Sequence, residues 1–394
     1  MLRRAALPAG ARFGALHAAA FVGLGVTLPF LPVWLETRGL SAAEIGVVLA
    51  LPPIVRILVA APLMSLVDRG FEERALLIGA YLGVALAYFG LSLARDPLVV
   101  AIIVVLSAVA NAPIVPTSDL VTLQAVRSDA RLDYGRVRLW GSIAFLVANV
   151  GAGYLFGAIP MDALPGLVAG LGLAGTAIAW AAVPRNSPAG EAKPENPQPR
   201  SPLPGRLWLV IAASAVTQAS HAAVYSFGSI HWRDLGYSST AIGYLWAIGV
   251  VAEIVVFAAF GRHVGRTALA LGLLAAGAGA ALLRFGAMSL DPPLAAAFVL
   301  QALHGVTFGA THLGTMAALA LLAPPAARGR AQGVLSSTQA LATAAATVMS
   351  GVVFRSAGPL VFLAMVPLAA CGLALAILSA RPAGAQPQSE RGGG

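Results

Sequence analysis

The chain has 394 residues, of which 58% are apolar and 10% are charged, and its mean hydropathy is +0.83. Soluble globular proteins carry close to a quarter charged residues, so this composition excludes a water-soluble globule. The formal net charge of +9 raises nucleic-acid binding as an alternative, which depends on where the basic residues lie.

Apolar runs long enough to cross a bilayer as helices recur along the whole chain. They predict twelve membrane spans, at about residues 13–35, 44–67, 74–94, 98–123, 137–159, 162–183, 207–231, 239–261, 267–288, 293–322, 332–355 and 358–380. A Pro-rich segment with the composition of a solvated linker divides the spans six and six. We therefore expect an all-α integral membrane protein with an N-terminal six-helix bundle (1–183), a cytoplasmic linker (184–206), a C-terminal six-helix bundle (207–380) and a disordered cytoplasmic tail (381–394).

The basic residues of the loops predict the orientation of the spans, because cytoplasmic loops carry an excess of Arg and Lys. With the N-terminus in the cytoplasm, most of the arginines fall in inside segments. The outside loops then keep only Arg38, Arg95, Arg233 and Arg355. Both termini are expected in the cytoplasm, and the basic balance follows from topology, so we expect no nucleic-acid partner.

The chain repeats part of its first half in its second half. The segment GLSAAEIG (39–46) aligns with GYSSTAIG (236–243), and the same spacing of 197 (253 minus 56) relates Arg56 to Glu253. Two six-span halves in the same orientation resemble the parallel repeat of the major facilitator superfamily. The stretch LMSLVDRGFEER (63–74) resembles the loop between spans two and three of that superfamily, which implies a gating role for Asp68 and Arg69.

Polar side chains form stripes on several spans at helical spacing. In a parallel-repeat transporter, spans one, four, seven and ten line a central cavity and span five lies beside it, so these stripes predict a pocket near the midplane. The alternative is that they only join helices by hydrogen bonds. We favour that alternative for Ser142, Ser214 and Thr311. The candidate pocket residues are Asn149, Gln218, His221, Tyr225, His304, Phe308 and His312.

Ionisable residues inside spans are rare, and they are functional candidates by default. Glu253 lies well inside the run 241–260, where an ionised carboxylate costs about 2.5–3.5 kcal/mol on insertion scales. It is therefore expected to face the interior, pair with Arg56 or Arg284, or carry a proton. The structural alternative is a fixed salt bridge between the halves, although a buried pair is weak evidence for stability. Asp119 and Arg138 lie nearer the span ends and can also snorkel to the surface.

Signatures of catalysis and of ATP use are absent from the sequence. It contains no P-loop, HExxH, CxxC or GxSxG motif, and its one cysteine is Cys371. No carboxylate or thiol cluster joins the histidines at metal spacing. We expect no enzyme activity, no cofactor and no metal.

Three stretches resemble a particular branch of the superfamily. They are DYGRVRLWGSIAF (133–145), SHAAVYSFGSIHW with GYSSTAIGYLWAIGVVAE (220–253), and LHGVTFGATHLGTMAAL (303–319). Together they resemble the 3-phenylpropionic acid transporter family, bacterial inner-membrane carriers taken to be proton symporters of arylpropionates. The resemblance runs from span one to span twelve.

The placement of charges also resembles the more distant lactose permease. That resemblance implies a charge network at Asp119, Arg138, Glu253, Arg284 and His304. The permease keeps a second carboxylate one turn after its span-ten histidine as proton carrier. This chain has Thr307 there, so proton coupling would rest on Glu253, His304 or His312.

These observations predict a secondary active transporter that imports a small organic acid with a proton, with an arylpropionate as the implied substrate. An acid needs a cation, so we expect Arg56 or Arg138 to bind its carboxylate, with walls formed by Trp140, Tyr225, Trp246 and Phe308. The alternatives are a sugar or nucleoside symporter, a drug efflux carrier, and a membrane receptor that transports nothing. We expect a monomer in the lipid bilayer of the inner membrane.

Overall fold

The computed structural model describes residues 8–184 and 202–381, and all regular structure in these ranges is helical. Twelve helical segments are long and apolar enough to cross a membrane, which confirms the predicted spans. In lipid, every backbone N–H and C=O must be satisfied within the segment, and a helix does so. Most of the predicted linker 184–206 and of the predicted tail 381–394 lies outside the described residues.

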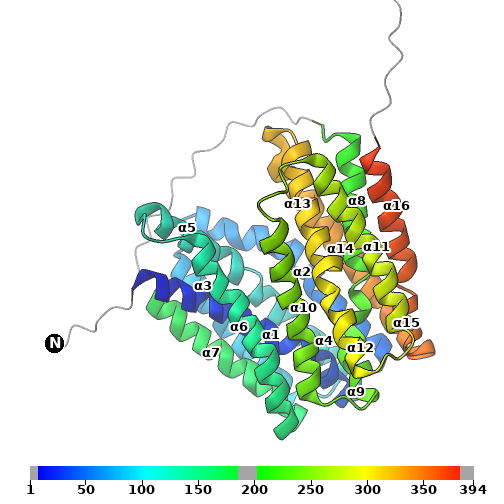
Figure 1. The fold of residues 1–394 in the computed structure, drawn as a ribbon. Helices are drawn as coiled ribbons and strands as arrows, with labels where there is room; N and C mark the ends of the chain where they lie inside the picture. The colour runs from blue at the N-terminus through cyan, green and yellow to red at the C-terminus, as the bar shows by residue number, and fades with distance from the viewer. Residues whose placement is uncertain (1–7, 185–201, 382–394) are drawn as a thin grey trace, which may run out of the picture.

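The first six spans are built from seven α-helices and a short 3₁₀ turn (Figure 1). The fourth span is interrupted next to Pro113, and the sixth begins with the 3₁₀ turn. The elements are α1 (Ala9–Thr37), α2 (Ala42–Asp68), α3 (Glu73–Leu93), α4 (Pro97–Asn111), α5 (Ile114–Ser128), α6 (Tyr134–Ala158), η1 (Met161–Ala163) and α7 (Leu164–Ala182).

The last six spans are more segmented. Two of them, spans seven and ten, contain a π-helical turn near the middle, η2 and η3. The elements are α8 (Gly205–Ala219), η2 (Val224–Gly228), α9 (Ser229–Asp234), α10 (Ser239–Phe260), α11 (Thr267–Met288), α12 (Leu294–Ala302), η3 (Gly305–Ala310), α13 (Thr311–Leu322), η4 (Pro325–Ala327), α14 (Arg328–Ala357), α15 (Leu360–Leu363) and α16 (Val366–Ala380).

The internal repeat is visible in the local geometry of the second and eighth spans. Gly39 and Gly236 adopt left-handed φ angles of 82° and 84°, which residues other than glycine rarely take. Two residues later, Ser41 and Ser238 each cap a helix by accepting a hydrogen bond from a backbone N–H of the first turn. The aligned segments therefore make the same turn and start the same helix.

Each half packs mainly within itself, and the halves meet mainly along two helix pairs. Helix α1 packs against α6 and α7, while α8 packs against α14 and α16. Between the halves, α2 contacts α14 and α6 contacts α10. Figure 1 shows the N-terminal half inclined against the C-terminal half, so that they converge at the lower end of the view.

Glycines allow this convergence. A Cβ atom at Gly46 would lie 2.9 Å from the Cα atom of Gly351, and one at Gly243 would lie 2.5 Å from the backbone oxygen of Asn149. All four contacting helix segments lie at the end of the molecule away from Pro8 and Arg381. The two halves are therefore closed against each other on the side opposite the described chain ends.

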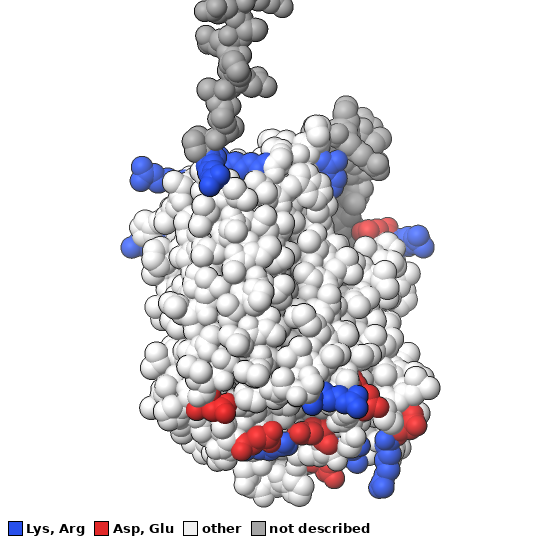
Figure 2. Space-filling view, turned by 90° about the vertical axis from the view of Figure 1, so that its right-hand side faces the viewer, with Lys and Arg blue, Asp and Glu red and all other residues white. Residues whose placement is uncertain are grey.

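The surface between the two ends of the molecule is apolar. Figure 2 shows a broad uncharged band, with Lys and Arg at the upper end and mixed charges at the lower end. Large hydrophobic side chains such as Leu86, Leu93, Leu283 and Val299 are exposed within the spans. An exposed apolar belt of this extent marks a lipid-facing surface.

Candidate functional site

A cavity of about 310 Å³ lies between the two halves, near the middle of the spans. This volume is at the lower end of the range for small-molecule sites. The first half contributes side chains from α1 and α6, and the second half contributes side chains from η2, α10, α11, α12 and η3. The lining residues are Phe21, Leu24, Leu28, Arg138, Ser142, Phe145, Val224, Tyr225, Trp246, Gly249, Val250, Glu253, Arg284, Gln301, His304 and Phe308.

Aromatic rings form much of the wall on the C-terminal side. Tyr225, on η2, stacks on Trp246 with ring centroids 5.9 Å apart and on His221 at the same distance. Phe308, on η3, stacks on His304 at 5.1 Å. π-Helical turns recur at functional sites. Here each of the two turns carries an aromatic side chain that lines the cavity.

Arg284 is the buried cation of this wall, with only 1% of its surface exposed. One guanidinium nitrogen donates to His304 Nδ1 at 3.2 Å and to Thr307 Oγ1 at 3.1 Å, and the other donates to Gln301 Oε1. An arginine can only donate, so His304 Nδ1 is an acceptor and its ring is neutral. Arg284 is thus held entirely by neutral groups.

Thr307 extends this network to His221. The ring nitrogen His221 Nδ1 lies 3.2 Å from the carbonyl of Thr217, which can only accept, so Nδ1 carries the proton. Nε2 of the neutral ring then accepts from the Thr307 hydroxyl, at 2.9 Å. Thr307 stands where the lactose permease is expected to keep a carboxylate. Its hydroxyl connects Arg284 and His221 by hydrogen bonds.

Glu253 lines the same cavity but forms no ion pair. Its side chain packs against Gly309 of η3. No Lys, Arg or His nitrogen of the described residues lies within 4.0 Å of its carboxylate. The expected salt bridge of Glu253 with Arg56 or Arg284 is therefore not formed in this conformation.

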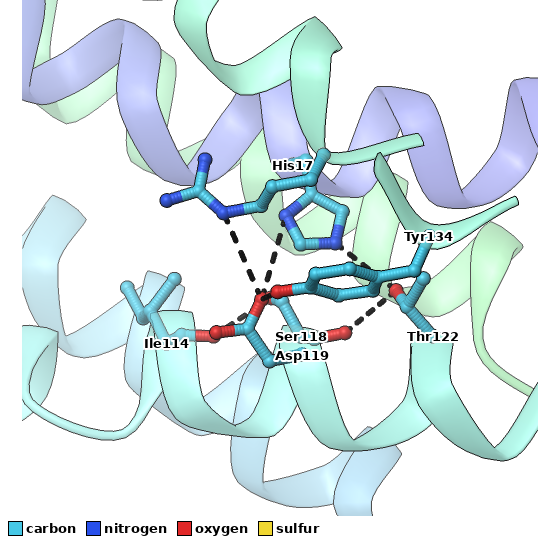
Figure 3. Close-up of polar contacts among 7 residues, drawn as sticks. His17, Ile114, Ser118, Asp119, Thr122 and Tyr134 are labelled. Carbon is cyan, nitrogen blue, oxygen red and sulfur yellow. Dashed lines mark hydrogen bonds and ion pairs between the residues drawn. The ribbon is translucent and has the colours of Figure 1, made fainter. Parts of the chain in front are cut away.

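Arg138 is the cation of the N-terminal wall. Its guanidinium carbon lies 4.1 Å from the centroid of the Phe21 ring, and its Nε lies 3.9 Å from Asp119 Oδ1. Asp119 also accepts a hydrogen bond from Tyr134 at 2.9 Å (Figure 3). The structure thus joins Asp119 and Arg138 and places Arg138, a third exposed, at the cavity.

Two predicted substrate-binding residues lie elsewhere. Arg56 is exposed on α2 and is not part of the cavity wall, so it does not occupy the expected position for binding the substrate carboxylate in this structure. Trp140 is 52% exposed on α6, where its ring packs over Gly14 of α1, and it also lies outside the cavity. Span two carries almost no polar side chain besides Arg56, so its sequence does not reveal which face points inward. In span five, Trp140 comes two residues after Arg138 and therefore lies on the side of the helix away from Arg138 and Ser142, which line the cavity.

The other predicted residues outside the cavity wall are partly buried and partly exposed. Asn149 and Gln218 are buried, and neither the Asn149 amide nor Gln218 Oε1 has a hydrogen-bond partner among the described residues. His312 is exposed and stacks on Phe308 at 6.1 Å. Asp68 and Arg69 are exposed at the end of α2, where the described residues provide no ion pair for them.

The sequence reasoning missed two residues around Arg138. Phe21 lines the cavity under the guanidinium, and His17 is fully buried beside Asp119. A histidine in the first apolar run was a visible signal, since polar residues in spans are rare. Its partners come from the fourth and fifth spans, and no periodicity within one span indicates them.

A sequence profile of the MFS_1 like family matches residues 18–364. The chain is 32% identical over 303 residues to the "Probable 3-phenylpropionic acid transporter" of Escherichia coli (strain K12), covering 75% of this chain and 78% of that protein. It is also 31% identical over 299 residues to the "Maltose permease" of Geobacillus stearothermophilus, covering 73% of each.

Solved structures share the fold at low sequence identity. The nucleoside transporter NupG superposes with a TM-score of 0.80 at 17% identity, over 95% of this chain and 98% of that one. A bacterial homologue of the human lysosomal transporter Spinster, inward-facing and unoccupied, gives 0.73 at 14% identity, over 94% and 96%. With twelve spans, two half-molecules and a cavity between them, the chain is a transporter of the major facilitator superfamily and belongs to its MFS_1 like family, on the 3-phenylpropionic acid transporter branch.

Proposed function

We propose that the chain imports a small organic acid together with a proton, and that the substrate is 3-phenylpropionate or a related arylpropionate. One observation carries the proposal: the cavity holds two arginines, Arg138 and Arg284, and a carboxylate, Glu253, that pairs with neither. A cation-rich cavity of low polarity attracts an anion.

The rest of the wall suits the aryl part of such an acid. Tyr225, Trp246 and Phe308 offer flat apolar faces, and Trp246 is fixed by the hydrogen bond that its indole N–H donates to Ser229 Oγ at 2.9 Å. Phe21 and Phe145 close the opposite side. Of the two arginines expected to dock the carboxylate, Arg138 is the one that lines the cavity, so we assign it that role.

Glu253 supplies the coupling. An ionised Glu253 and a substrate carboxylate in one small cavity repel each other, and that repulsion is strong where water is scarce. Substrate anion therefore binds better when Glu253 is protonated, and proton and anion cross together without net charge. After the substrate leaves and Glu253 loses its proton, the Glu253 carboxylate can form an ion pair with an arginine once the cavity has rearranged.

The named relatives support an organic acid and also a second candidate. The 32% identical protein is described as a 3-phenylpropionic acid transporter, which agrees with the arginines. The 31% identical protein is described as a maltose permease, which favours a neutral sugar instead. A sugar would be held by hydrogen-bonding groups such as Gln301 and Glu253, and it would need no cation.

We further propose that the protein lies in the inner membrane with both termini cytoplasmic, and that residues 1–183 and 207–380 rock as two bodies. The arginine-rich end seen in Figure 2 supports this orientation. The closed contacts Gly46–Gly351 and Gly153–Gly243 would then face outward, and the structure would be open toward the cytoplasm.

Uptake into vesicles that hold the purified protein tests the proposal. We expect labelled 3-phenylpropionate to accumulate only under an inward proton gradient, and unlabelled maltose or nucleoside not to compete. Uptake of labelled maltose that 3-phenylpropionate does not inhibit would replace the organic acid by the sugar.

A further inference from the structure

A second titratable cluster lies in the N-terminal half, behind the cavity wall. Figure 3 shows His17 of α1 above Asp119 and Thr122 of α5, with Tyr134 of α6 beside them. His17 is fully buried, whereas Asp119 is 30% exposed. His17 Nε2 lies 3.1 Å from Thr122 Oγ1, and His17 Nδ1 lies 3.9 Å from Asp119 Oδ1.

The hydrogen bonds determine where the histidine carries its proton. The Thr122 hydroxyl donates its only hydrogen to the carbonyl of Ser118, at 2.7 Å. Its oxygen can therefore only accept from His17, so Nε2 carries the hydrogen and Nδ1 of the neutral ring is a bare lone pair. Nδ1 has no hydrogen-bond partner among the described residues, and it faces the carboxylate. Two acceptor atoms thus face each other across a gap with no hydrogen between them.

One added proton would resolve this contact. Placed on Nδ1, it would turn the ring into a cation next to Asp119 and allow a charge-assisted hydrogen bond after a small approach of the two groups. A hydronium ion that reaches the exposed part of Asp119 would supply the proton. Its O–H bond breaks and leaves water, while the lone pair of Nδ1 forms the new N–H bond.

Asp119 already interacts with Arg138. The side chains of Arg138 and His17 approach the same carboxylate oxygen, Oδ1. Arg138 Nε is 3.9 Å from Asp119 Oδ1, within ion-pair range but beyond hydrogen-bond distance. The other face of the guanidinium rests on Phe21 in the cavity wall. A cationic His17 would neutralise Asp119 and repel Arg138. Arg138 would then lose its ionic partner while it still rests on Phe21, and its charge would be available to another anion.

We propose that His17 and Asp119 form a second proton-binding site, and that a proton bound there releases Arg138 to dock the substrate carboxylate. The inference rests on the proposed function for the identity of that substrate. It adds a switch on the N-terminal side to the proton-binding role of Glu253 on the C-terminal side.

The surroundings of His17 contain few other titratable groups. Asp119 and Arg138 are the charged side chains that act on it, and the Tyr134 ring lies edge-on at 6.3 Å. Helix α7 packs against α1, the helix that carries His17, and α7 has no titratable side chain. Of the other charged groups on elements that contact α1, Arg56, Asp68, Arg127 and Arg136 are exposed. The rest interact with other groups: Glu44 with Ser41, Arg233 with Glu36, Asp162 with Arg38 and His231 with Asp291, while Tyr225 and Glu253 line the cavity.

The first test observes the ring of His17 without any substrate. In full-length protein labelled with ¹⁵N-histidine in lipid nanodiscs, the His17 signals are those missing from His17→Gln. We expect a proton on Nε2 at alkaline pH and a second one on Nδ1 at acidic pH. In Asp119→Asn, half-protonation of His17 should require a proton concentration about tenfold higher. His263→Gln, far from the cluster, should leave the His17 titration unchanged. A His17 titration that Asp119→Asn does not move overturns the inference.

Thr122→Val is a second variant that tests the same hydrogen-bond geometry if Asp119→Asn does not fold. It removes the acceptor of the Nε2 hydrogen and leaves Asp119 in place. Loss of the Nε2–H tautomer in this variant supports the assigned geometry, and an unchanged tautomer contradicts it.

The second test measures binding of 3-phenylpropionate to wild type and His17→Gln. We expect about tenfold weaker binding by the variant at acidic pH and equal binding at alkaline pH, because only the protonated ring releases Arg138. Equal affinity at every pH overturns the inference and leaves the proposed function standing. A wild type that binds no 3-phenylpropionate overturns the proposed substrate, and the histidine titration then decides on His17 by itself.

Discussion

Arg138 in the N-terminal half and Arg284 in the C-terminal half both line the cavity, and each belongs to a cluster with a histidine. Their charges are balanced differently. Arg138 has a carboxylate, Asp119, in its own cluster. Arg284 is held by the neutral groups of Gln301, His304 and Thr307, while Glu253 stands unpaired in the same cavity.

On the proposed function, this difference predicts which wall of the cavity changes more in free energy when a proton or an anion arrives. A buried cation without a counter-ion and a carboxylate without a partner are both costly in a medium of low polarity. The C-terminal wall holds both, so a proton or an anion arriving there changes its free energy most. The N-terminal wall is balanced until its own histidine binds a proton. The two repeated halves thus differ in how their cavity charges are paired.

The largest effect is expected from Arg284→Met, which removes the cation of the C-terminal wall. Uptake should fall to the level of empty vesicles. The free energy of unfolding should change by no more than about 1–3 kcal/mol. Removal of a buried charge that no carboxylate compensates offsets the loss of the donor to Gln301, His304 and Thr307. Thermal unfolding of the purified variant beside wild type checks this. A strong loss of stability would make Arg284 a structural residue.

A smaller effect is expected at the contact between the halves. Gly243→Ala would place a Cβ atom 2.5 Å from the backbone oxygen of Asn149, and such overpacking costs about 1–3 kcal/mol. The closed contact between α6 and α10 should become less populated. Distances between spin labels on the two helices report it. Gly272→Ala, on α11 in open space, is the matched control.

Arg138→Lys tests whether the arginine of the N-terminal wall docks the substrate carboxylate. Lysine keeps the charge but loses the planar fork that grips a carboxylate, so 3-phenylpropionate should bind about tenfold more weakly. Calorimetry or a radioligand assay measures the affinity. Arg136→Lys changes an exposed arginine two residues away and should have no effect. Unchanged binding by Arg138→Lys would remove Arg138 from the docking role.

The smallest effect is expected from Glu36→Gln, which breaks the ion pair with Arg233 that joins the halves at the closed end. Both side chains are about a third exposed. An exposed pair contributes about 0.2–1 kcal/mol, so the rocking equilibrium should shift by at most a few-fold. The same spin-label distances would show it, and a complete change of conformation would mean that this pair holds the closed end by itself.

The spans could be predicted from sequence because lipid imposes two strong conditions, an apolar surface and a satisfied backbone. The turn at Gly39 and its repeat at Gly236 could be predicted from the aligned residues. The outward facing of Arg56 could not, because α2 carries almost no other polar side chain. The outward facing of Trp140 follows from its place two residues after Arg138, on the other side of α6. The π turns at Tyr225 and Phe308 leave no distinct sequence pattern, and His17 meets Asp119 only through packing of distant spans.

Glu253 is proposed to couple the proton to the substrate, and the most direct test compares two modes of transport in Glu253→Gln. A neutral amide cannot release a proton, so net accumulation of 3-phenylpropionate under a proton gradient should disappear. Exchange of external labelled for internal unlabelled substrate needs no net proton movement and should continue. A variant that still accumulates 3-phenylpropionate with the gradient would contradict the role of Glu253.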